Sequence, residues 1–257
     1  MSNLYLKKSL GQHFLKDESV LQKIADAIGD MSVFKTVVEI GPGMGALTKY
    51  LLPQKHSSFY AVELDDRWAE HLANTHPVLQ GKIIHEDVLK ADLSFMQNPT
   101  HILGNFPYNI STQIVFRLIE EREKIAQMTG MFQKEVALRI AAEHGSKDYG
   151  VMSVLTQTYF NCEYLFDVAA ESFNPPPKVV SGVIRLKRKE TPLPVFDEVF
   201  FKRVVKAAFN QRRKTMRNSL KELVNDKSLL AKEIFNLRPE QISVSEFQAL
   251  SNLIQKQ

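Results

Sequence analysis

A tight turn between a short apolar strand and an apolar helix carries the most chemically specific groups of the sequence. Residues 104–109 read Gly-Asn-Phe-Pro-Tyr-Asn, and open α/β sheets bind ligands at the carboxyl ends of such strands. Asn105 offers an amide oxygen, Pro107 fixes the direction of the carbonyl groups beside it, and Tyr108 offers an aromatic face. The turn therefore predicts a receptor for a planar group with an amine, such as adenine. The alternative is a plain strand-to-helix turn in which Asn caps and Tyr packs.

A glycine loop follows another apolar strand at residues 37–40. Gly41, Gly43 and Ala46 satisfy the loose dinucleotide pattern, because glycine allows a sharp turn and close approach of a ligand. Glu63 stands at the end of the next strand, 22 residues after Gly41, where a carboxylate suits the two hydroxyls of a ribose. These features predict a nucleoside-binding α/β half, and they leave NAD open as the ligand.

Two further polar positions allow either a binding role or a structural one. Asp87 ends a third strand, where it is placed to accept a hydrogen bond from an adenine amino group or to cap the next segment. Gln12 and His13 lie between Leu10 and Phe14 and form a polar pair that is directed either into a site or to the surface.

The composition limits the class of protein. The chain has 257 residues, of which 44% are hydrophobic, and no apolar run approaches the length of a membrane span. The first sixteen residues lack the apolar core of a secretory signal. A single cysteine, Cys162, excludes an internal disulfide and a cysteine-rich metal site. We therefore expect a cytoplasmic protein without a membrane segment or a bound metal.

Positive charge is concentrated in one segment. Residues 185–221 hold twelve Lys or Arg and three acids, an excess of nine positive charges. The net charge of the whole chain is +4, so the remainder carries −5. This asymmetry predicts a polyanionic partner, whereas a short run of charges is more often a solvated helix face.

The periodicity of apolar residues predicts an α/β sheet followed by helices. The composition of residues 187–194 is that of a linker, and the apolar stripe from Phe200 to Phe209 predicts a helix after it. The two final strands would form a hairpin that gives the sheet an antiparallel edge. Strands are expected at residues 37–40, 59–65, 82–87, 101–103, 130–133, 164–168 and 181–186, and helices at residues 20–28, 113–119, 134–142, 153–160, 200–209, 210–220 and 245–254.

Four stretches in this order resemble the KsgA (RsmA) family of ribosomal RNA adenine N6-dimethyltransferases, from Gly11 to about Leu220. They are residues 11–15 (Gly-Gln-His-Phe-Leu), 39–43 (Glu-Ile-Gly-Pro-Gly), 104–111 (Gly-Asn-Phe-Pro-Tyr-Asn-Ile-Ser) and 209–215 (Phe-Asn-Gln-Arg-Arg-Lys-Thr). The family often has Asn at the position of His13 and Leu at that of Phe106, and both departures are chemically mild.

The resemblance implies a Rossmann-like class I methyltransferase domain at residues 1–188, with a seven-stranded sheet and an antiparallel edge. A small, all-helical, RNA-binding domain would follow at residues 189–257. The implied cofactor is S-adenosylmethionine. The residues implied to bind it are His13, Leu15, Gly41, Glu63, Asp87 and Asn105, those of the catalytic turn are Asn105, Phe106, Pro107 and Tyr108, and those expected to bind RNA are Arg212, Arg213, Lys214 and Arg217.

The implied reaction is dimethylation of two adjacent adenines near the 3′ end of 16S rRNA, within the small ribosomal subunit or its precursor, by a monomer that takes part in subunit biogenesis. The Asn105 side chain and the carbonyl of Phe106 or Pro107 would accept the N6 hydrogens, while Tyr108 stacks on the flipped base. Three alternatives stay open: an NAD-dependent oxidoreductase, a non-catalytic RNA-binding module on this scaffold, and the sister group that methylates large-subunit rRNA.

Overall fold

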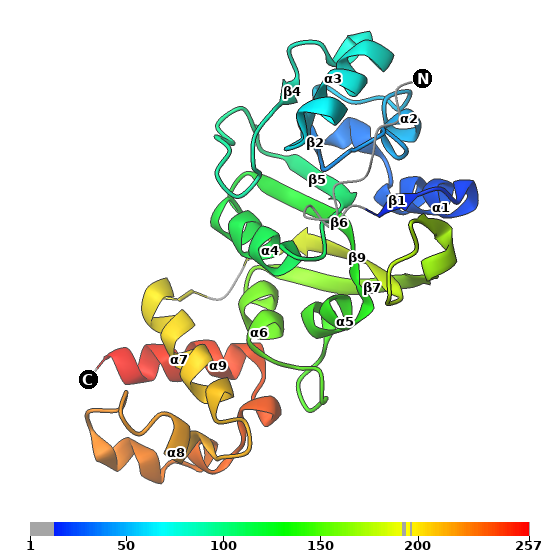
Figure 1. The fold of residues 1–257 in the computed structure, drawn as a ribbon. Coiled ribbons are helices and arrows are strands. Elements are labelled where there is room, and N and C mark those ends of the chain that lie inside the picture. Colours follow the sequence, from blue (N-terminus) through cyan, green and yellow to red (C-terminus); the bar gives the residue numbers. More distant parts are fainter. Residues whose placement is uncertain (1–12, 192–193, 196, 257) are drawn as a thin grey trace. The chain divides into compact units, whose positions relative to one another are not determined.

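The computed structural model of the chain (Figure 1) describes residues 13–191, 194–195 and 197–256. Leu10, Gly11 and Gln12, to which the sequence drew attention, lie outside these residues. The strands are β1 (Phe14–Leu15), β2 (Thr36–Ile40), β3 (Phe59–Val62), β4 (Ile83–Ile84), β5 (Thr100–Asn105), β6 (Ile125–Gln133), β7 (Phe160–Val168), β8 (Phe173–Asn174) and β9 (Ser181–Arg188). The α-helices are α1 (Glu18–Ile28), α2 (Thr48–Leu51), α3 (Asp66–Thr75), α4 (Ser111–Glu120), α5 (Lys134–Ala141), α6 (Val151–Gln157), α7 (Glu198–Asn210), α8 (Met216–Ser219) and α9 (Val244–Gln255).

Seven strands form one sheet in the order β4-β3-β2-β5-β6-β9-β7. The strands from β4 to β6 pair in parallel, and β9 pairs antiparallel with β6. The predicted class I sheet with seven strands and an antiparallel edge is therefore confirmed. Because the parallel strands run the same way, the segments that follow β2, β3 and β5 meet at one edge of the sheet.

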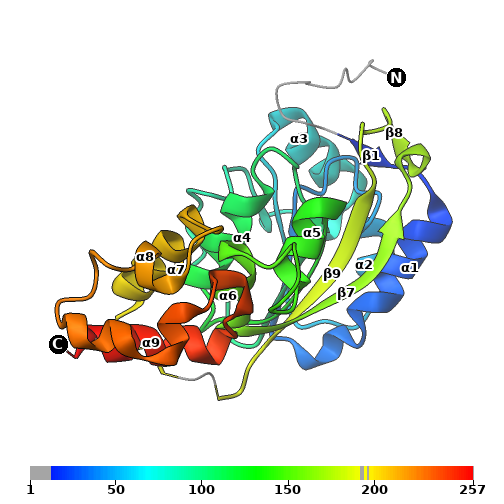
Figure 2. The same ribbon diagram turned by 90° about the horizontal axis from the view of Figure 1, so that it is seen from below.

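Both faces of the sheet are covered, which explains why its central strands are apolar throughout. Every residue of β2 is buried, as is usual for a parallel strand between two layers of helices. Helix α1 and helix α4 lie on opposite sides of the sheet (Figure 2). On the α1 side, Leu21, Ile24 and Ile28 join a core cluster with Leu103 of β5 and Val183 of β9. Asp17 caps α1 by accepting hydrogen bonds from the amides of Ser19 and Val20.

A separate ribbon of two strands ties the beginning of the described chain to a segment far along it. Phe14 pairs with Asn174 and Leu15 with Phe173 in an antiparallel register. The main-chain amide of Lys16 also donates to the carbonyl of Ser172 at 2.9 Å. The ribbon holds residues 13–15 in place, and two of the predicted cofactor-binding residues belong to this segment.

The chain divides into two compact units. The first comprises Met1–Ala137 and Glu163–Arg188, and the second comprises Leu138–Cys162 and Lys189–Gln257. These are units of compact packing, and the domain boundary that the sequence suggests after residue 188 stays a prediction. Residues 138–162, which the sequence placed in the first domain, group with the C-terminal residues.

The second unit is organised around α7, whose buried residues are Phe201, Val204, Val205 and Ala208. Helices α6, α8 and α9 all pack against it, and Phe209 at its end stacks on Phe247 of α9 with ring centroids 5.7 Å apart. The predicted apolar stripe is therefore the core of this unit.

Several predicted elements differ from the observed ones. The strand expected at residues 82–87 is only β4, Ile83–Ile84, so Asp87 follows the strand and does not end it. The strands expected at residues 130–133 and 164–168 begin earlier, at Ile125 and Phe160. Helix α6 ends at Gln157 and β7 begins at Phe160, so the helix expected up to residue 160 is shorter. Residues 211–215 form a turn, and only Met216–Ser219 of the predicted basic helix is helical. The last helix is capped by Ser243, whose side chain and Glu246 form a reciprocal capping box, and not by Ser245.

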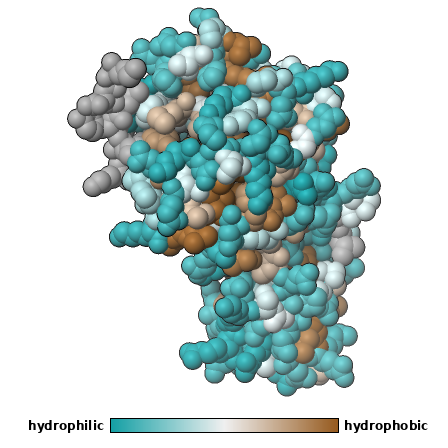
Figure 3. Space-filling model, turned by 90° about the vertical axis from the view of Figure 1, so that its right-hand side faces the viewer, coloured by the Kyte–Doolittle hydropathy of each residue, from teal (hydrophilic) through white to brown (hydrophobic). Residues whose placement is uncertain are grey.

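The surface is mainly hydrophilic on the face shown in Figure 3, where hydrophobic residues gather in separate patches. Large exposed hydrophobic side chains among the described residues include Val33, Met44, Leu64, Val179 and Val180. None of the described helices combines the length and the apolar character needed to cross a membrane.

Candidate active site

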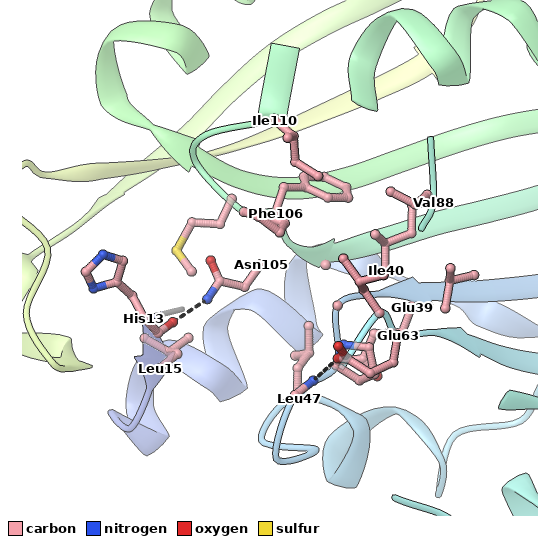
Figure 4. Close-up of a pocket in the computed structure, with 18 of the residues that line it drawn as sticks. His13, Leu15, Glu39, Ile40, Leu47, Glu63, Val88, Asn105, Phe106 and Ile110 are labelled. Atoms are coloured by element: carbon pink, nitrogen blue, oxygen red, sulfur yellow. Dashed lines mark hydrogen bonds between the residues drawn. The ribbon is translucent and has the colours of Figure 1, made fainter. Parts of the chain in front are cut away.

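A pocket lies in the first unit at the carboxyl ends of β2, β3 and β5 (Figure 4). It has a volume of about 210 Å³ and joins the glycine loop to the turn at residues 104–109. All residues predicted to bind the cofactor or to form the catalytic turn line it: His13, Leu15, Gly41, Glu63, Asp87, Asn105, Phe106, Pro107 and Tyr108. The structure thus brings together the residues that the sequence had selected from five separate segments.

The glycine loop needs glycine for two physical reasons. Gly41 and Gly43 have φ angles of 65° and 54°, in the left-handed region that residues with a Cβ atom rarely adopt. A Cβ on Gly43 would lie 2.6 Å from Cε1 of Phe14. The loop therefore lies directly against the β1 segment, and together they form one wall of the pocket.

Glu63 follows β3 and connects the glycine loop to that strand. Its carboxylate accepts hydrogen bonds from the amide of Gly43 at 3.0 Å and from that of Asp65 at 2.9 Å. The side chain is 6% exposed, and burial raises the pKa of Glu63 above its ordinary value. Since a carboxylate has about four lone-pair sites, it keeps acceptor capacity for hydroxyl donors in the pocket. This donor and acceptor set fits a ribose diol.

Glu39 is a pocket residue to which the sequence interpretation gave no role. It is the fourth residue of β2, is 2% exposed, and accepts a hydrogen bond from the Thr48 hydroxyl at 2.6 Å. Burial raises its pKa to about 7, and the neighbouring Glu63 adds to this effect. The sequence does carry a signal for Glu39, because it is an acid inside an apolar strand immediately before a glycine loop. A buried acid needs a polar partner, which marks the position as part of a polar site.

Asn105 is oriented by the β1 segment. Its Nδ2 donates to the main-chain carbonyl of His13 at 3.0 Å, which Figure 4 shows as a dashed line. A carbonyl only accepts, so this contact fixes which end of the amide carries nitrogen. The Oδ1 atom has no hydrogen-bond partner among the residues that the structure describes, and it is available as an acceptor in the pocket.

Phe106 and Pro107 contribute to the turn through their backbone. The ring of Phe106 is 1% exposed and packs on Phe132, with centroids 5.0 Å apart. In Figure 4 it points away from the contact between His13 and Asn105. The carbonyl of Pro107 accepts a hydrogen bond from the amide of Ile110 at 3.2 Å. Of the two carbonyls considered from the sequence, that of Phe106 is therefore the one not used by this turn.

Tyr108 and His13 stand beside each other at the same end of the pocket. Their rings are nearly parallel, at 24°, with centroids 5.8 Å apart. The Tyr108 hydroxyl forms a short hydrogen bond with Ser181 Oγ, and burial raises the pKa of Tyr108. His13 Nδ1 donates to the carbonyl of Pro175 at 2.8 Å, so the proton lies on Nδ1. His13 is thus a partly buried rim residue with a fixed tautomer.

Asp87 combines the two roles that the sequence left open. It lines the pocket, and its carboxylate also accepts a hydrogen bond from the amide of Leu89 at 3.0 Å. This contact is the capping interaction, and the carboxylate retains further lone pairs toward the pocket. No group of three or more His, Cys, Asp or Glu suited to a metal occurs within the described ranges.

The predicted RNA-binding residues of the second unit fall into two groups. Arg212 donates to the Ser146 carbonyl at 3.2 Å, and Arg217 donates to Asn236 Oδ1 at 2.8 Å. Arg213 and Lys214 are exposed on the turn after α7. The first two therefore have structural partners, whereas the latter two point their charge into solvent.

Several cations of the basic segment, residues 185–221, have partners within their own unit. Arg185 forms an ion pair with Glu163 at 2.6 Å, and Arg188 donates to Asn98 Oδ1 at 3.1 Å. Lys189 donates to the carbonyl of Gln157 at 2.6 Å. The charge asymmetry of the sequence therefore overstates the number of cations available to a polyanion.

The family of the chain follows from its similarity to known proteins over nearly its whole length. A family model described as "Ribosomal RNA adenine dimethylase" matches residues 3–256. The chain belongs to this family. It is an S-adenosylmethionine-dependent adenine-N6 dimethyltransferase of ribosomal RNA, as the resemblance implied, so the NAD-dependent and non-catalytic alternatives are wrong.

Individual relatives agree with the family assignment. The chain is 49% identical over 256 residues to "Ribosomal RNA small subunit methyltransferase A" of Cytophaga hutchinsonii, covering 99% of each chain. It is 50% identical to the protein of the same name from Flavobacterium johnsoniae, covering 99% of this chain and 98% of that one. Among solved structures, a dimethyladenosine transferase from Plasmodium falciparum matches with a TM-score of 0.81 and 25% identity, covering 95% and 97% of the two chains. The 23S rRNA methyltransferase ErmE shares the fold, with a TM-score of 0.69 and 24% identity over 94% of this chain and 99% of that one.

Proposed function

We propose that this dimethylase acts on two adjacent adenines near the 3′ end of 16S rRNA, in the small ribosomal subunit or its precursor, and takes part in subunit biogenesis. The names of relatives that are about half identical over nearly the full chain support the small-subunit substrate. The observation that carries the proposal is the single pocket that joins Glu63 to Asn105 and Tyr108. The carboxylate expected to bind a nucleoside and the groups expected to accept an amine thus line the same cavity, which supports the proposal.

The residues of the pocket fit S-adenosylmethionine. The buried carboxylate of Glu63 would accept the two ribose hydroxyls, and Asp87 would accept from the adenine amino group. The glycine loop at Gly41 allows close approach of the ligand backbone, and His13 and Leu15 would close the pocket from the β1 segment. When bound, the cofactor supplies a methyl group on a sulfonium ion.

The catalytic turn would activate the target amine by accepting its hydrogens. The lone pair of adenine N6 is delocalised into the ring, so the amine is a weak nucleophile. Hydrogen bonds from N6 to Asn105 Oδ1 and to the carbonyl of Phe106 favour a pyramidal nitrogen whose lone pair is free to attack. The nitrogen would become positively charged as the new carbon–nitrogen bond replaces the methyl–sulfur bond. Its proton would then be acidic enough to pass to solvent, so no strong general base is required.

Tyr108 would hold the target base after it has left its stack. Its ring faces the pocket and is fixed at the hydroxyl by Ser181, so a base can stack on a surface that does not move. The Tyr108 hydroxyl has a raised pKa, which suits a neutral stacking partner. The same pocket would accept the monomethylated amine for the second transfer.

RNA phosphates would be bound by exposed cations of the second unit. Arg213 and Lys214 lie on the turn after α7, and Arg203 and Lys206 are exposed on α7 itself. Phosphate contacts of this kind supply affinity that falls steeply with salt. Arg212 and Arg217 would contribute mainly by shaping this surface. We further propose that the enzyme is a cytoplasmic monomer, with residues 1–188 binding the cofactor and residues 189–257 binding RNA.

The test is methylation, in parallel reactions, of isolated small and large ribosomal subunits that lack the modification, followed by mass spectrometry of nucleosides from 16S and 23S rRNA. We expect N6,N6-dimethyladenosine in 16S rRNA only. Asn105→Ala should lower the single-turnover rate by a factor on the order of 10² to 10³, since it removes a hydrogen-bond acceptor aimed at the reacting amine. Asn74→Ala, which removes an exposed amide of helix α3 outside the pocket, is the matched control and should retain activity. Equal rates for the two variants would refute the role of Asn105. Dimethylated adenosine in 23S rRNA would refute the proposal that 16S rRNA is the substrate.

A further inference from the structure

The loop between β8 and β9 is fastened to the pocket at both of its ends. At one end the carbonyl of Pro175 accepts the hydrogen bond from His13. At the other end Ser181 bonds to the hydroxyl of Tyr108. His13 and Tyr108 both line the pocket, so the loop forms the outer rim at the end of the cavity where the catalytic turn lies.

The middle of this loop presents an apolar surface to solvent. Val179 is 43% exposed and Val180 is 40% exposed, and Lys178 beside them is also exposed. The three prolines at residues 175–177 restrict the backbone before them, and the carbonyl of Val180 accepts a hydrogen bond from the amide of Lys134 at 3.0 Å. We call residues 178–180 the rim tripeptide. It holds two exposed valines and a cation in a fixed position, outside the set of residues that line the pocket.

We propose that the rim tripeptide binds the RNA nucleotide adjacent to the target adenine. This inference rests on the proposed function. An adenine that enters the pocket must leave its stack, which uncovers one face of the neighbouring base. An apolar side chain can cover such a face, as wedge residues do in other nucleic-acid complexes. Val179 and Val180 are placed to do so, and Lys178 is placed to bind the phosphate that joins the two nucleotides.

Three observations favour RNA over a protein partner at this surface. The exposed apolar area consists of two valines, whereas a stable protein interface needs about 800 Å² on each side. The adjacent lysine matches the charge of a phosphate. The surface also continues directly into the cavity that receives the target base, through Ser181 and Tyr108.

The experiment compares matched pairs of substitutions at opposite edges of the sheet. Val179→Ser and Lys178→Gln alter the rim tripeptide. Val33→Ser and Lys35→Gln are the controls, because these exposed residues precede β2 and therefore lie at the edge away from the pocket. Steady-state methylation is measured with unmethylated small ribosomal subunits, and binding of S-adenosylmethionine by calorimetry.

We expect each rim variant to raise KM for the subunit about fivefold, a loss typical of one apolar or phosphate contact, with unchanged cofactor affinity. Lys178→Gln should also reduce the slope of log affinity against log salt by about one. Both controls should match the wild type. The proposal would be overturned if the rim variants had the same KM for the subunit and the same salt slope as the wild type.

A photo-crosslinking residue placed at position 179 provides a second readout that does not depend on turnover. We expect crosslinks to nucleotides within one or two positions of the target adenine. Crosslinks only to distant RNA or to ribosomal protein, or none, would overturn the proposal. Failure of the proposed function is distinguishable, because the wild-type enzyme would then leave 16S rRNA unmethylated in the same assay.

Discussion

Gly130→Ala tests how the fold positions the catalytic turn. A Cβ atom on Gly130 would lie 2.0 Å from Cε2, 2.7 Å from Cδ2 and 3.1 Å from Cζ of the Phe106 ring. Contacts between carbon atoms are ordinarily about 3.5–4.0 Å, so the ring must move by more than an ångström. The Phe106 ring is 1% exposed and packs on Phe132, so the core has no empty space into which the ring could move.

The expected cost follows from overpacking. Forcing extra volume into a closed core costs roughly 1–3 kcal/mol, and the severity of this overlap places Gly130→Ala at the upper end, about 3 kcal/mol. Because Phe106 is adjacent to Asn105, a displaced ring also moves the amide. A misplacement of about 1 Å at a reacting group can lower the rate on the order of 10²-fold. We therefore expect loss of both stability and activity from a single methyl group far from solvent.

The assay is a double-mutant cycle with Phe106→Leu, read by denaturant unfolding and by single-turnover methylation. Leucine lacks the Cε2 and Cζ atoms that the new methyl group would meet at 2.0 Å and 3.1 Å, so the double variant should be at least about 1 kcal/mol more stable than additivity predicts, as for residues in direct contact. Gly150→Ala is the control, since Gly150 is extended and a Cβ there would meet nothing closer than 4.0 Å. Additive free energies, or a Gly130→Ala variant as stable as the control, would refute the reasoning.

Two further predictions concern the buried acid and the exposed cations. Burial raises the pKa of Glu39 to about 7. Between about pH 4.5 and pH 7 the folded state therefore keeps a proton that the unfolded state has lost. As a result, Glu39 lowers the free energy of unfolding as the pH rises through this range. The free energy of unfolding of Glu39→Gln relative to wild type should thus rise by up to about 3 kcal/mol between pH 4.5 and pH 8. Urea titrations of both proteins measure this difference, and the opposite pH effect of buried His101 cancels because both proteins contain it. A difference that does not change with pH would contradict the pKa assignment. Replacing Arg213 and Lys214 together by Gln should reduce the slope of log affinity for the subunit against log salt by about two, without changing the melting temperature. Arg212→Gln should instead lower the melting temperature. The reverse pattern would contradict the assignment of RNA contacts to Arg213 and Lys214 and of a structural role to Arg212.

The sequence was informative where local pattern and packing agree. The apolar runs before Gly41, Glu63 and Asn105 predicted strands, and parallel pairing brought their ends to one edge, so the pocket could be predicted from spacing. The direction of the Phe106 side chain could not, because it depends on the missing Cβ of Gly130, which lies on another strand.

The helical predictions for the second unit failed where tertiary contacts decide. Arg212, Arg213 and Lys214 favour helix by propensity, yet the chain turns after Asn210 and the side chain of Arg212 reaches the Ser146 carbonyl. Residues 138–162 join this unit because α6 packs against α7 and α9. No local pattern in residues 151–157 identifies that partner.

The ribbon of β1 and β8 has a consequence for biosynthesis. Phe14–Leu15 and Phe173–Asn174 pair across about 160 residues, so an emerging polypeptide cannot complete the wall that orients Asn105 until most of the first unit has been translated. The enzyme therefore acquires its methyl-transferring ability only after Asn174 has been translated, and a shorter product of translation would be inert toward the ribosome that is making it.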